Sequence, residues 1–138
     1  MIAVFDIDGV LADASHRQHF VESRPKDWDA FFAAVGEDSV IEHGVALLRE
    51  FQARDAIVLL SGRPESTRAD THAWLERNGI EVERLVLRAN KDFRKAAVAK
   101  AALVRGIGDP EEVSVVVDDD ESVVETLTAL GYAAQLFR

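Results

Sequence analysis

The chain has 138 residues, of which 48% are hydrophobic and 30% charged, as expected for one globular domain with its own core. The absence of cysteine excludes a disulfide framework and a thiolate metal site. The net charge of −9 opposes a broad nucleic-acid-binding surface, because polyanions are repelled. It leaves room for one local cationic pocket that receives a nucleic-acid end.

The N-terminus has no basic region before an apolar core, and Asp6 interrupts any candidate signal peptide. No apolar run is long enough to span a bilayer. We therefore expect no membrane association and a cytoplasmic location.

The first predicted strand is the apolar run of residues 2–5, which is followed by Asp6, Asp8 and a turn at Gly9. Side chains alternate along a strand, so the two acids share a direction if the strand continues through both. If Gly9 already bends the chain, Asp8 approaches the same site from above. In both cases two acids meet at the carboxyl end of a strand, where open α/β sheets bind ligands.

Residues 14–42, called the insert below, are rich in helix formers and aromatic side chains and too numerous for an ordinary strand-to-helix loop. Pro25 separates two short predicted helices, and Asp27 is the expected N-cap of the second. We predict a small helical cap over the site. The alternative is that its aromatic residues, such as Trp28, simply pack onto the body of the domain.

The rest of the chain alternates between helical patterns and apolar strands. Further strands are predicted at residues 56–60, 85–87, 113–117 and 132–137, and helices at about 45–54, 65–78, 93–106 and 123–130. This order predicts an α/β fold, a doubly wound, Rossmann-like parallel sheet of about five strands, in a single domain of residues 1–138. A sheet that reverses after its third strand would place strands one and four side by side.

Polar side chains follow four of these apolar strands at their carboxyl ends. They are Asp6, Ser61 with Arg63, Arg88, and Asp118 with Asp119. A parallel sheet brings such groups to one edge, so we expect them to converge. Asp120 extends the acids to a triplet, and which two of the three face the site stays open, because Asp120 also suits a helix cap.

These residue types suit phosphoryl transfer assisted by a hard cation. Mg²⁺ prefers carboxylates, a carbonyl and waters, and it offsets the repulsion between clustered acids. The equatorial phosphate oxygens need a hydroxyl, a guanidinium and an ammonium as donors. Ser61, Arg63 or Arg88, and Lys100 can supply them.

Lys100 is the expected ammonium, rather than Lys91 or Lys95, because it falls on an apolar helical stripe that runs from Phe93 to Val104. A lysine on that stripe faces the sheet and needs an anionic partner. The alternative is a side chain that snorkels from the margin of the stripe to solvent.

The run Asp6-Ile7-Asp8-Gly9-Val10-Leu11 resembles the first motif of the haloacid dehalogenase superfamily, although Val10 replaces the common threonine. Ser61, Lys100 and Asp118-Asp119 match the second, third and fourth motifs in order. More narrowly, the chain resembles the 3′-phosphatase domain of phage polynucleotide kinase-phosphatase. The features that carry this likeness are Ser61-Gly62-Arg63, Thr71 with Trp74-Leu75, and Arg88 upstream of Lys100.

The resemblance implies a Mg²⁺-dependent phosphomonoesterase that works through an aspartyl-phosphate, acting on a polynucleotide or nucleotide 3′-phosphate. It implies that Asp6 is the nucleophile and Asp8 the general acid/base. The residues implied for the metal are Asp6, Asp8 through its main-chain carbonyl, Asp118 and Asp119, and those implied for the phosphate are Ser61, Gly62, Arg63, Arg88 and Lys100. No P-loop motif occurs, so this chain has no kinase half. Whether a kinase or ligase partner acts on a separate chain stays open.

Three other interpretations stay open. The first is a phosphatase of the same superfamily for small metabolites or 5′-nucleotides. The second is a non-catalytic phosphate-sensing or partner-binding domain, which Asp8 disfavours because binding alone needs no acid/base. The third is a phosphoacceptor receiver domain, which the Arg88 end of the third strand disfavours. His16 and Arg17 are weak candidates for substrate contact.

Overall fold

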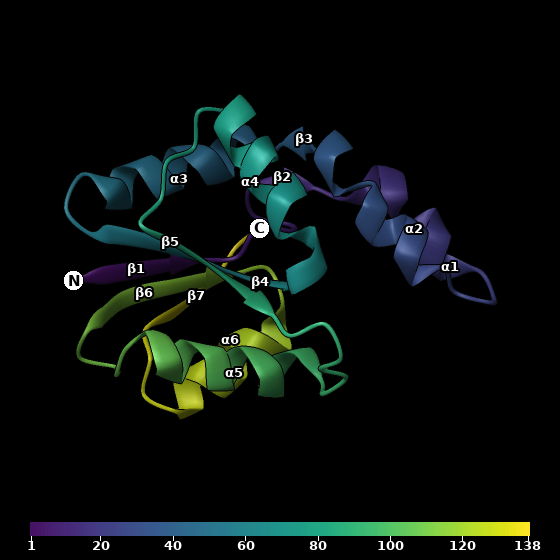
Figure 1. Cartoon of the computed structure of the whole chain (residues 1–138). Coiled ribbons are helices and arrows are strands. Elements are labelled where there is room, and N and C mark those ends of the chain that lie inside the picture. The colour runs from purple at the N-terminus through teal and green to yellow at the C-terminus, as the bar shows by residue number, and fades with distance from the viewer.

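The computed structural model describes residues 1–138 and contains a five-stranded parallel sheet in the order β5-β4-β1-β6-β7 (Figure 1). The strands are β1 (Ile2–Phe5), β4 (Ala56–Pro64), β5 (Arg84–Arg88), β6 (Val113–Asp118) and β7 (Ala134–Leu136). The predicted doubly wound α/β sheet is confirmed. The first and fourth predicted strands, β1 and β6, lie side by side.

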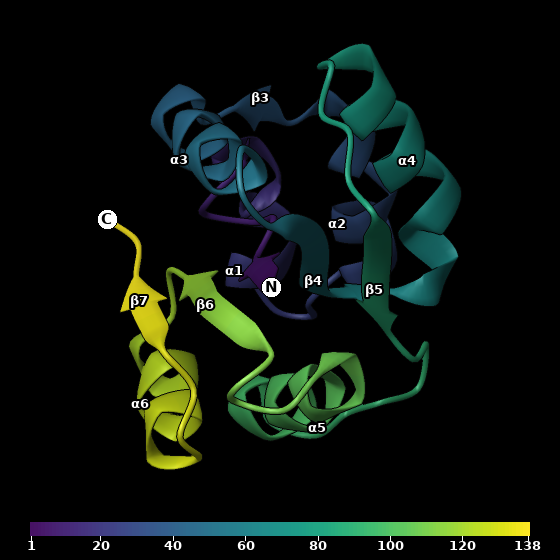
Figure 2. The ribbon, with the colours of Figure 1, turned by 90° about the vertical axis from the view of Figure 1, so that its left-hand side faces the viewer.

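Helices cover both faces of the sheet (Figure 2). One face packs against α3 (Glu42–Gln52) and α4 (Arg68–Arg77), and the other against α5 (Ala96–Ile107) and α6 (Glu121–Ala129). Side chains alternate between the two cores, so Phe5 joins the α3 and α4 side while Val4 joins the α5 and α6 side. Burial on both faces explains why these strands are continuous apolar runs rather than alternating patterns.

The insert forms short elements on the side of the sheet toward which the strand carboxyl ends point (Figure 1). They are η1 (Ser15–Arg17), α1 (His19–Glu22), α2 (Trp28–Ala33), η2 (Val35–Glu37) and β3 (Ser39–Val40), and β3 pairs antiparallel with β2 (Ala12–Asp13). The Asp27 side chain accepts a hydrogen bond of 3.0 Å from the N–H of Ala30, so the expected cap of the second helix forms. One further turn, η3 (Glu65–Thr67), precedes α4.

The prediction that a helix begins at Phe93 is wrong, because α5 begins at Ala96 and Phe93 lies in the preceding loop with 89% of its surface exposed. The Asp92 carboxylate accepts hydrogen bonds from the N–H and the guanidinium of Arg94, at 3.1 and 2.9 Å. Such local side-chain bonds compete with helix formation. No helix has the length and apolar character needed to cross a membrane.

Candidate active site

The register of the sheet brings the first and last acids of the sequence motifs together. Phe5 of β1 lies opposite Leu59 of β4 and Val117 of β6. The N–H of Asp6 donates a 2.9 Å hydrogen bond to the carbonyl of Val117, so the pairing continues one residue beyond β1. Asp6 therefore lies beside Asp118, the last residue of β6, although the two are far apart in the sequence.

Three carboxylates cluster at this edge of the sheet. Asp6, Asp118 and Asp119 each offer an oxygen within 4.8 Å of the others, and Asp6 and Asp118 are buried. Gly9 makes room for the third acid, because a Cβ at Gly9 would overlap the carboxylate of Asp119. The backbone of Gly9 also has a φ of +83°, which favours glycine.

Asp120, the third acid of the triplet, turns away from this cluster. Its carboxylate caps α6, accepting hydrogen bonds from the N–H and the hydroxyl of Ser122 at 2.9 and 2.8 Å. These bonds help lower the pKa of Asp120 against the effect of its partial burial. The triplet thus divides into two acids that face the cluster and one that caps a helix.

Lys100 reaches the cluster from the first half of α5. Its buried ammonium lies 2.7 Å from Oδ2 of Asp118 and 3.2 Å from Oδ2 of Asp6. Burial alone would lower the pKa of Lys100, but the two carboxylates outweigh burial and raise it. The side chain is therefore a buried ammonium held against two acids, not a snorkelling lysine.

One ammonium does not balance three acids at this site. Burial raises the pKa of Asp6 well above its ordinary value, and neighbouring Asp118 raises it further, while Lys100 opposes both. Burial and Asp118 also raise the pKa of Asp119. Clustered oxygen donors with an excess of negative charge are the donor set that a hard divalent cation prefers, so these residues fit Mg²⁺.

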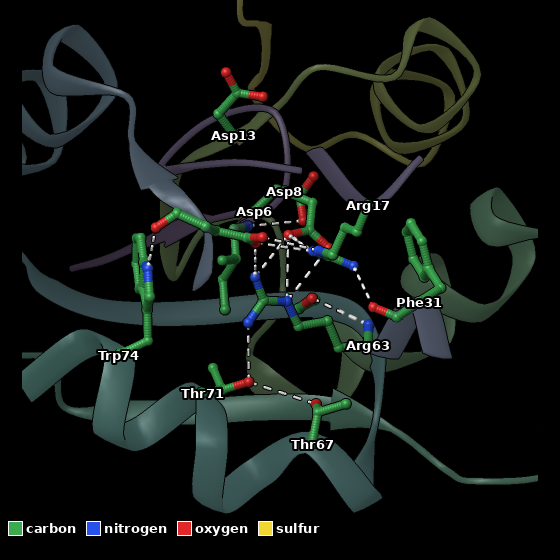
Figure 3. A network of polar contacts seen from close by, with 12 residues as sticks. Asp6, Asp8, Asp13, Arg17, Phe31, Arg63, Thr67, Thr71 and Trp74 are labelled. Carbon is green, nitrogen blue, oxygen red and sulfur yellow. Dashed lines mark hydrogen bonds and ion pairs between the residues drawn. The ribbon is translucent and has the colours of Figure 1, made fainter. Parts of the chain in front are cut away.

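Asp8 belongs to a second network, which Figure 3 shows with Arg17 and Arg63. Its Oδ1 accepts hydrogen bonds from Nη2 of Arg17 at 3.0 Å and from Nη2 of Arg63 at 2.8 Å. Both arginine side chains are fully buried, whereas the Asp8 side chain is 32% exposed. Asp8 is thus an accessible carboxylate oriented by two guanidiniums.

The same two guanidiniums also donate hydrogen bonds to Asp38, which no sequence motif indicated. Its buried carboxylate accepts bonds from Nε and Nη2 of Arg17 and from Nη2 of Arg63, each at 2.9 Å. His16 Nε2 lies 2.6 Å from Asp38 Oδ1. The Asp38 carbonyl accepts a 2.7 Å bond from the Trp74 indole (Figure 3). The insert is therefore tied to the orientation of Asp8.

The remaining predicted phosphate ligands contact different groups. Ser61 is buried and its hydroxyl accepts a 3.1 Å hydrogen bond from the N–H of Arg63. A Cβ placed on Gly62 would meet Cε of Lys100 at 4.0 Å, so Gly62 borders the lysine. Arg88 instead donates to the carbonyl of Arg94 and lies 3.7 Å from Asp92. Its Nε is buried without a partner.

A family model described as the phosphatase domain of polynucleotide kinase PNKP matches residues 1–135. No curated protein matches the sequence. Among solved structures, the chain resembles one from the Pnkp1/Rnl/Hen1 RNA repair complex, with 23% identity and a TM-score of 0.78. The match covers 99% of this chain but only 42% of that one.

Two further structures resemble the chain over most of their own length. One is a HAD family enzyme from Bacteroides thetaiotaomicron in complex with magnesium and inorganic phosphate, with 14% identity, a TM-score of 0.62 and coverage of 99% and 93%. The other is a haloacid dehalogenase-like hydrolase from Streptococcus pneumoniae, with 15% identity, a TM-score of 0.68 and coverage of 96% and 82%. At these identities the likeness concerns the fold.

Proposed function

The chain belongs to the family of polynucleotide kinase PNKP phosphatase domains and is a phosphatase of the haloacid dehalogenase type, and from this premise we propose a specific reaction. It is the Mg²⁺-dependent hydrolysis of a polynucleotide or nucleotide 3′-phosphate through an aspartyl-phosphate. The observation that carries the proposal is the cluster of Asp6, Asp118, Asp119 and Lys100 at one sheet edge. It supplies a nucleophile, cation ligands and an ammonium within contact of one another.

Asp6 is the proposed nucleophile and Asp8 the proposed general acid/base. A carboxylate oxygen of Asp6 forms a bond to phosphorus while the bond from phosphorus to the ester oxygen breaks, and Asp8 protonates that oxygen. Asp8, now ionised, takes a proton from the water that attacks phosphorus and releases phosphate from Asp6. The 32% exposure of the Asp8 side chain supports this role, because substrate and water can reach it.

Asp6, Asp118, Asp119 and the main-chain carbonyl of Asp8 are the groups that would hold Mg²⁺. When bound, the cation shields the nucleophile from the negative charge of the phosphate and neutralises charge on its oxygens. Lys100 supplies a further positive charge, and its contacts of 2.7 and 3.2 Å fix it against Asp118 and Asp6. The Ser61 hydroxyl and the backbone at Gly62 complete the proposed phosphate cradle beside it.

The two predicted arginine ligands act differently in this proposal. Arg63 uses its donors on Asp8, Asp38 and Thr71, so it contributes to phosphate transfer by orienting Asp8. Arg88 reaches phosphate only after its guanidinium leaves the carbonyl of Arg94. Its unpartnered Nε supports that role, because a buried donor without an acceptor is costly.

The family and the likeness to a structure from an RNA repair complex support a nucleic-acid 3′ end as the substrate. The match covers 42% of that relative's chain. We also propose that a kinase or ligase is a partner of this phosphatase. A phosphatase for small metabolites or 5′-nucleotides is the second candidate, favoured by the net charge of −9, which repels long polyanions. The cytoplasm is the proposed location.

A substrate panel tests the proposal. Phosphate release is measured with and without Mg²⁺ for 3′-phosphorylated oligonucleotides, 3′- and 5′-mononucleotides and sugar phosphates. We expect the 3′-phosphorylated substrates to be preferred, metal removal to abolish turnover, and Asp6→Asn to be inactive. Full activity of Asp6→Asn would refute the mechanism, and a preference for sugar phosphates would favour the second candidate.

A further inference from the structure

A groove of about 780 Å³ lies between α2 of the insert and the loop that follows β5. Trp28 and Phe32 line it from α2, and Phe93 lines it from the loop. Trp28 and Phe93 have 49% and 89% of their surfaces exposed, and they are the only aromatic residues among the exposed large hydrophobic side chains of the chain. Both exposed aromatic residues thus line one groove.

Trp28 is exposed but held in place. Its ring stacks on Phe32, with centroids 5.8 Å apart and planes 23° apart, and it meets Phe31 edge-on at 5.6 Å. The ammonium of Lys26 lies 5.7 Å from the indole centroid. A fixed aromatic face next to a cation is the kind of surface on which nucleobases stack in proteins that bind single strands.

The groove adjoins the candidate active site. Gly62 lines the groove and lies between Ser61 and Arg63 in β4. The position of a Cβ on Gly62 is 4.0 Å from Cε of Lys100, the residue that contacts Asp6 and Asp118. A phosphate held by Lys100 would therefore lie at the Gly62 end of the groove.

The formal charge of the groove also suits an anionic nucleic-acid strand better than the net charge of the whole chain does. Its lining carries three cations, Arg88, Lys91 and Arg94, against three acids, Asp29, Asp70 and Asp92. The groove is thus formally neutral in a chain of net charge −9. Asp92 is paired with both arginines, and Lys91 takes part in no ion pair. A strand that enters here meets less repulsion than elsewhere.

We propose that this groove binds the 3′-terminal nucleoside of the substrate, with its base stacked on Trp28 or Phe93. The inference rests on the proposed 3′-phosphatase function and specifies how that site selects nucleic acid over a small phosphate ester. Stacking uses the face that every base has, so the groove gives little discrimination among bases. The phosphate lies at Lys100 and the base lies between α2 and the loop.

Kinetics on a matched substrate pair test the groove. We compare kcat/KM for a 3′-phosphorylated oligonucleotide with kcat/KM for the same oligonucleotide whose 3′ residue is abasic. Loss of stacking is expected to lower kcat/KM roughly 5- to 100-fold, both in the abasic substrate and in Trp28→Ala or Phe93→Ala acting on the normal one. Val98→Ala and Leu130→Ala, at exposed sites outside the groove, are expected to keep wild-type values.

Tryptophan fluorescence provides a readout that needs no turnover. Inactive Asp6→Asn is mixed with a 3′-phosphorylated oligonucleotide, and we expect its tryptophan fluorescence to be quenched. The quenching should disappear in the double variant that also carries Trp28→Phe, because the remaining tryptophan, Trp74, is fully buried. Equal wild-type rates on the normal and abasic substrates, or full activity of both alanine variants, would refute nucleoside binding in the groove. Neither result would affect the proposed 3′-phosphatase function. Hydrolysis of sugar phosphates without any hydrolysis of 3′-phosphorylated oligonucleotides would overturn both.

Discussion

Burial and the carboxylate of Asp118 oppose a negative charge on Asp6, and Lys100 favours it. Burial prevails, so the pKa of Asp6 is raised well above its ordinary value of 3.8. An acid with a raised pKa binds its proton more tightly in the folded state than in the unfolded state. Its contribution to stability is therefore most favourable at low pH and declines as the pH rises above the unfolded value.

This pH dependence of stability predicts how Asp6→Asn compares with the wild type in metal-free buffer. Asparagine does not titrate. Near pH 4, about the pKa of Asp6 in the unfolded chain, Asp6 is still protonated in the folded protein, so the wild type and the variant should have similar stability. The variant should gain on the wild type as the pH rises toward about 7. Urea unfolding in the presence of a chelator measures the difference, and a difference that stays constant or shrinks with pH would contradict the burial of Asp6.

Gly9→Ala should weaken the proposed metal site as well as the fold. The left-handed backbone at Gly9 costs roughly 1–2 kcal/mol with any Cβ, and that Cβ would also displace the Asp119 carboxylate. Gly79→Ala is the matched control, because Gly79 has a φ of +67° but open space around its Cβ position. Both variants should lose stability in urea, and Gly9→Ala alone should lose the rise in Tm that we expect Mg²⁺ to cause in the wild type.

At the scale of elements, the strands and the acids that end them follow directly from the sequence. Continuous apolar runs predict buried parallel strands, and the order of strands places Asp6 beside Asp118. The structure of the insert is harder to predict, because its short turns have no periodicity that shows which side chains point inward. Asp38 is buried where Arg17 and Arg63, from two other segments, converge on it, and no local sequence pattern predicts such a contact.

Asp38 should therefore matter both for the insert and for Asp8. Removing its charge leaves two buried guanidiniums with only Asp8 as a carboxylate partner, which should cost roughly 3–5 kcal/mol of unfolding free energy. Asp38→Asn is compared in urea unfolding and in phosphate release with Glu37→Gln, an exposed acid one residue away. We expect large losses for the first and none for the second, and a stable, fully active Asp38→Asn would show that the network does not orient Asp8.

At the scale of the whole molecule, the sheet separates two cores, and its carboxyl edge supports one site. The acids that follow β1, the last residue of β6, the lysine of α5 and the arginines of β4 and η1 meet there. A net charge of −9 makes this chain a poor general binder of polyanions. A nucleic-acid substrate would therefore have to be bound locally, next to the proposed catalytic acids.

The proposed covalent step can be measured by quenching a reaction with acid and locating phosphate on the protein. The enzyme is mixed with Mg²⁺ and a 3′-phosphorylated oligonucleotide, stopped within one turnover and digested for mass spectrometry. We predict that phosphate is found on Asp6, that Asp6→Asn carries none, and that omission of Mg²⁺ prevents labelling. Phosphate on another residue, or steady hydrolysis with no labelled protein at any quench time, would contradict the role of Asp6 as nucleophile.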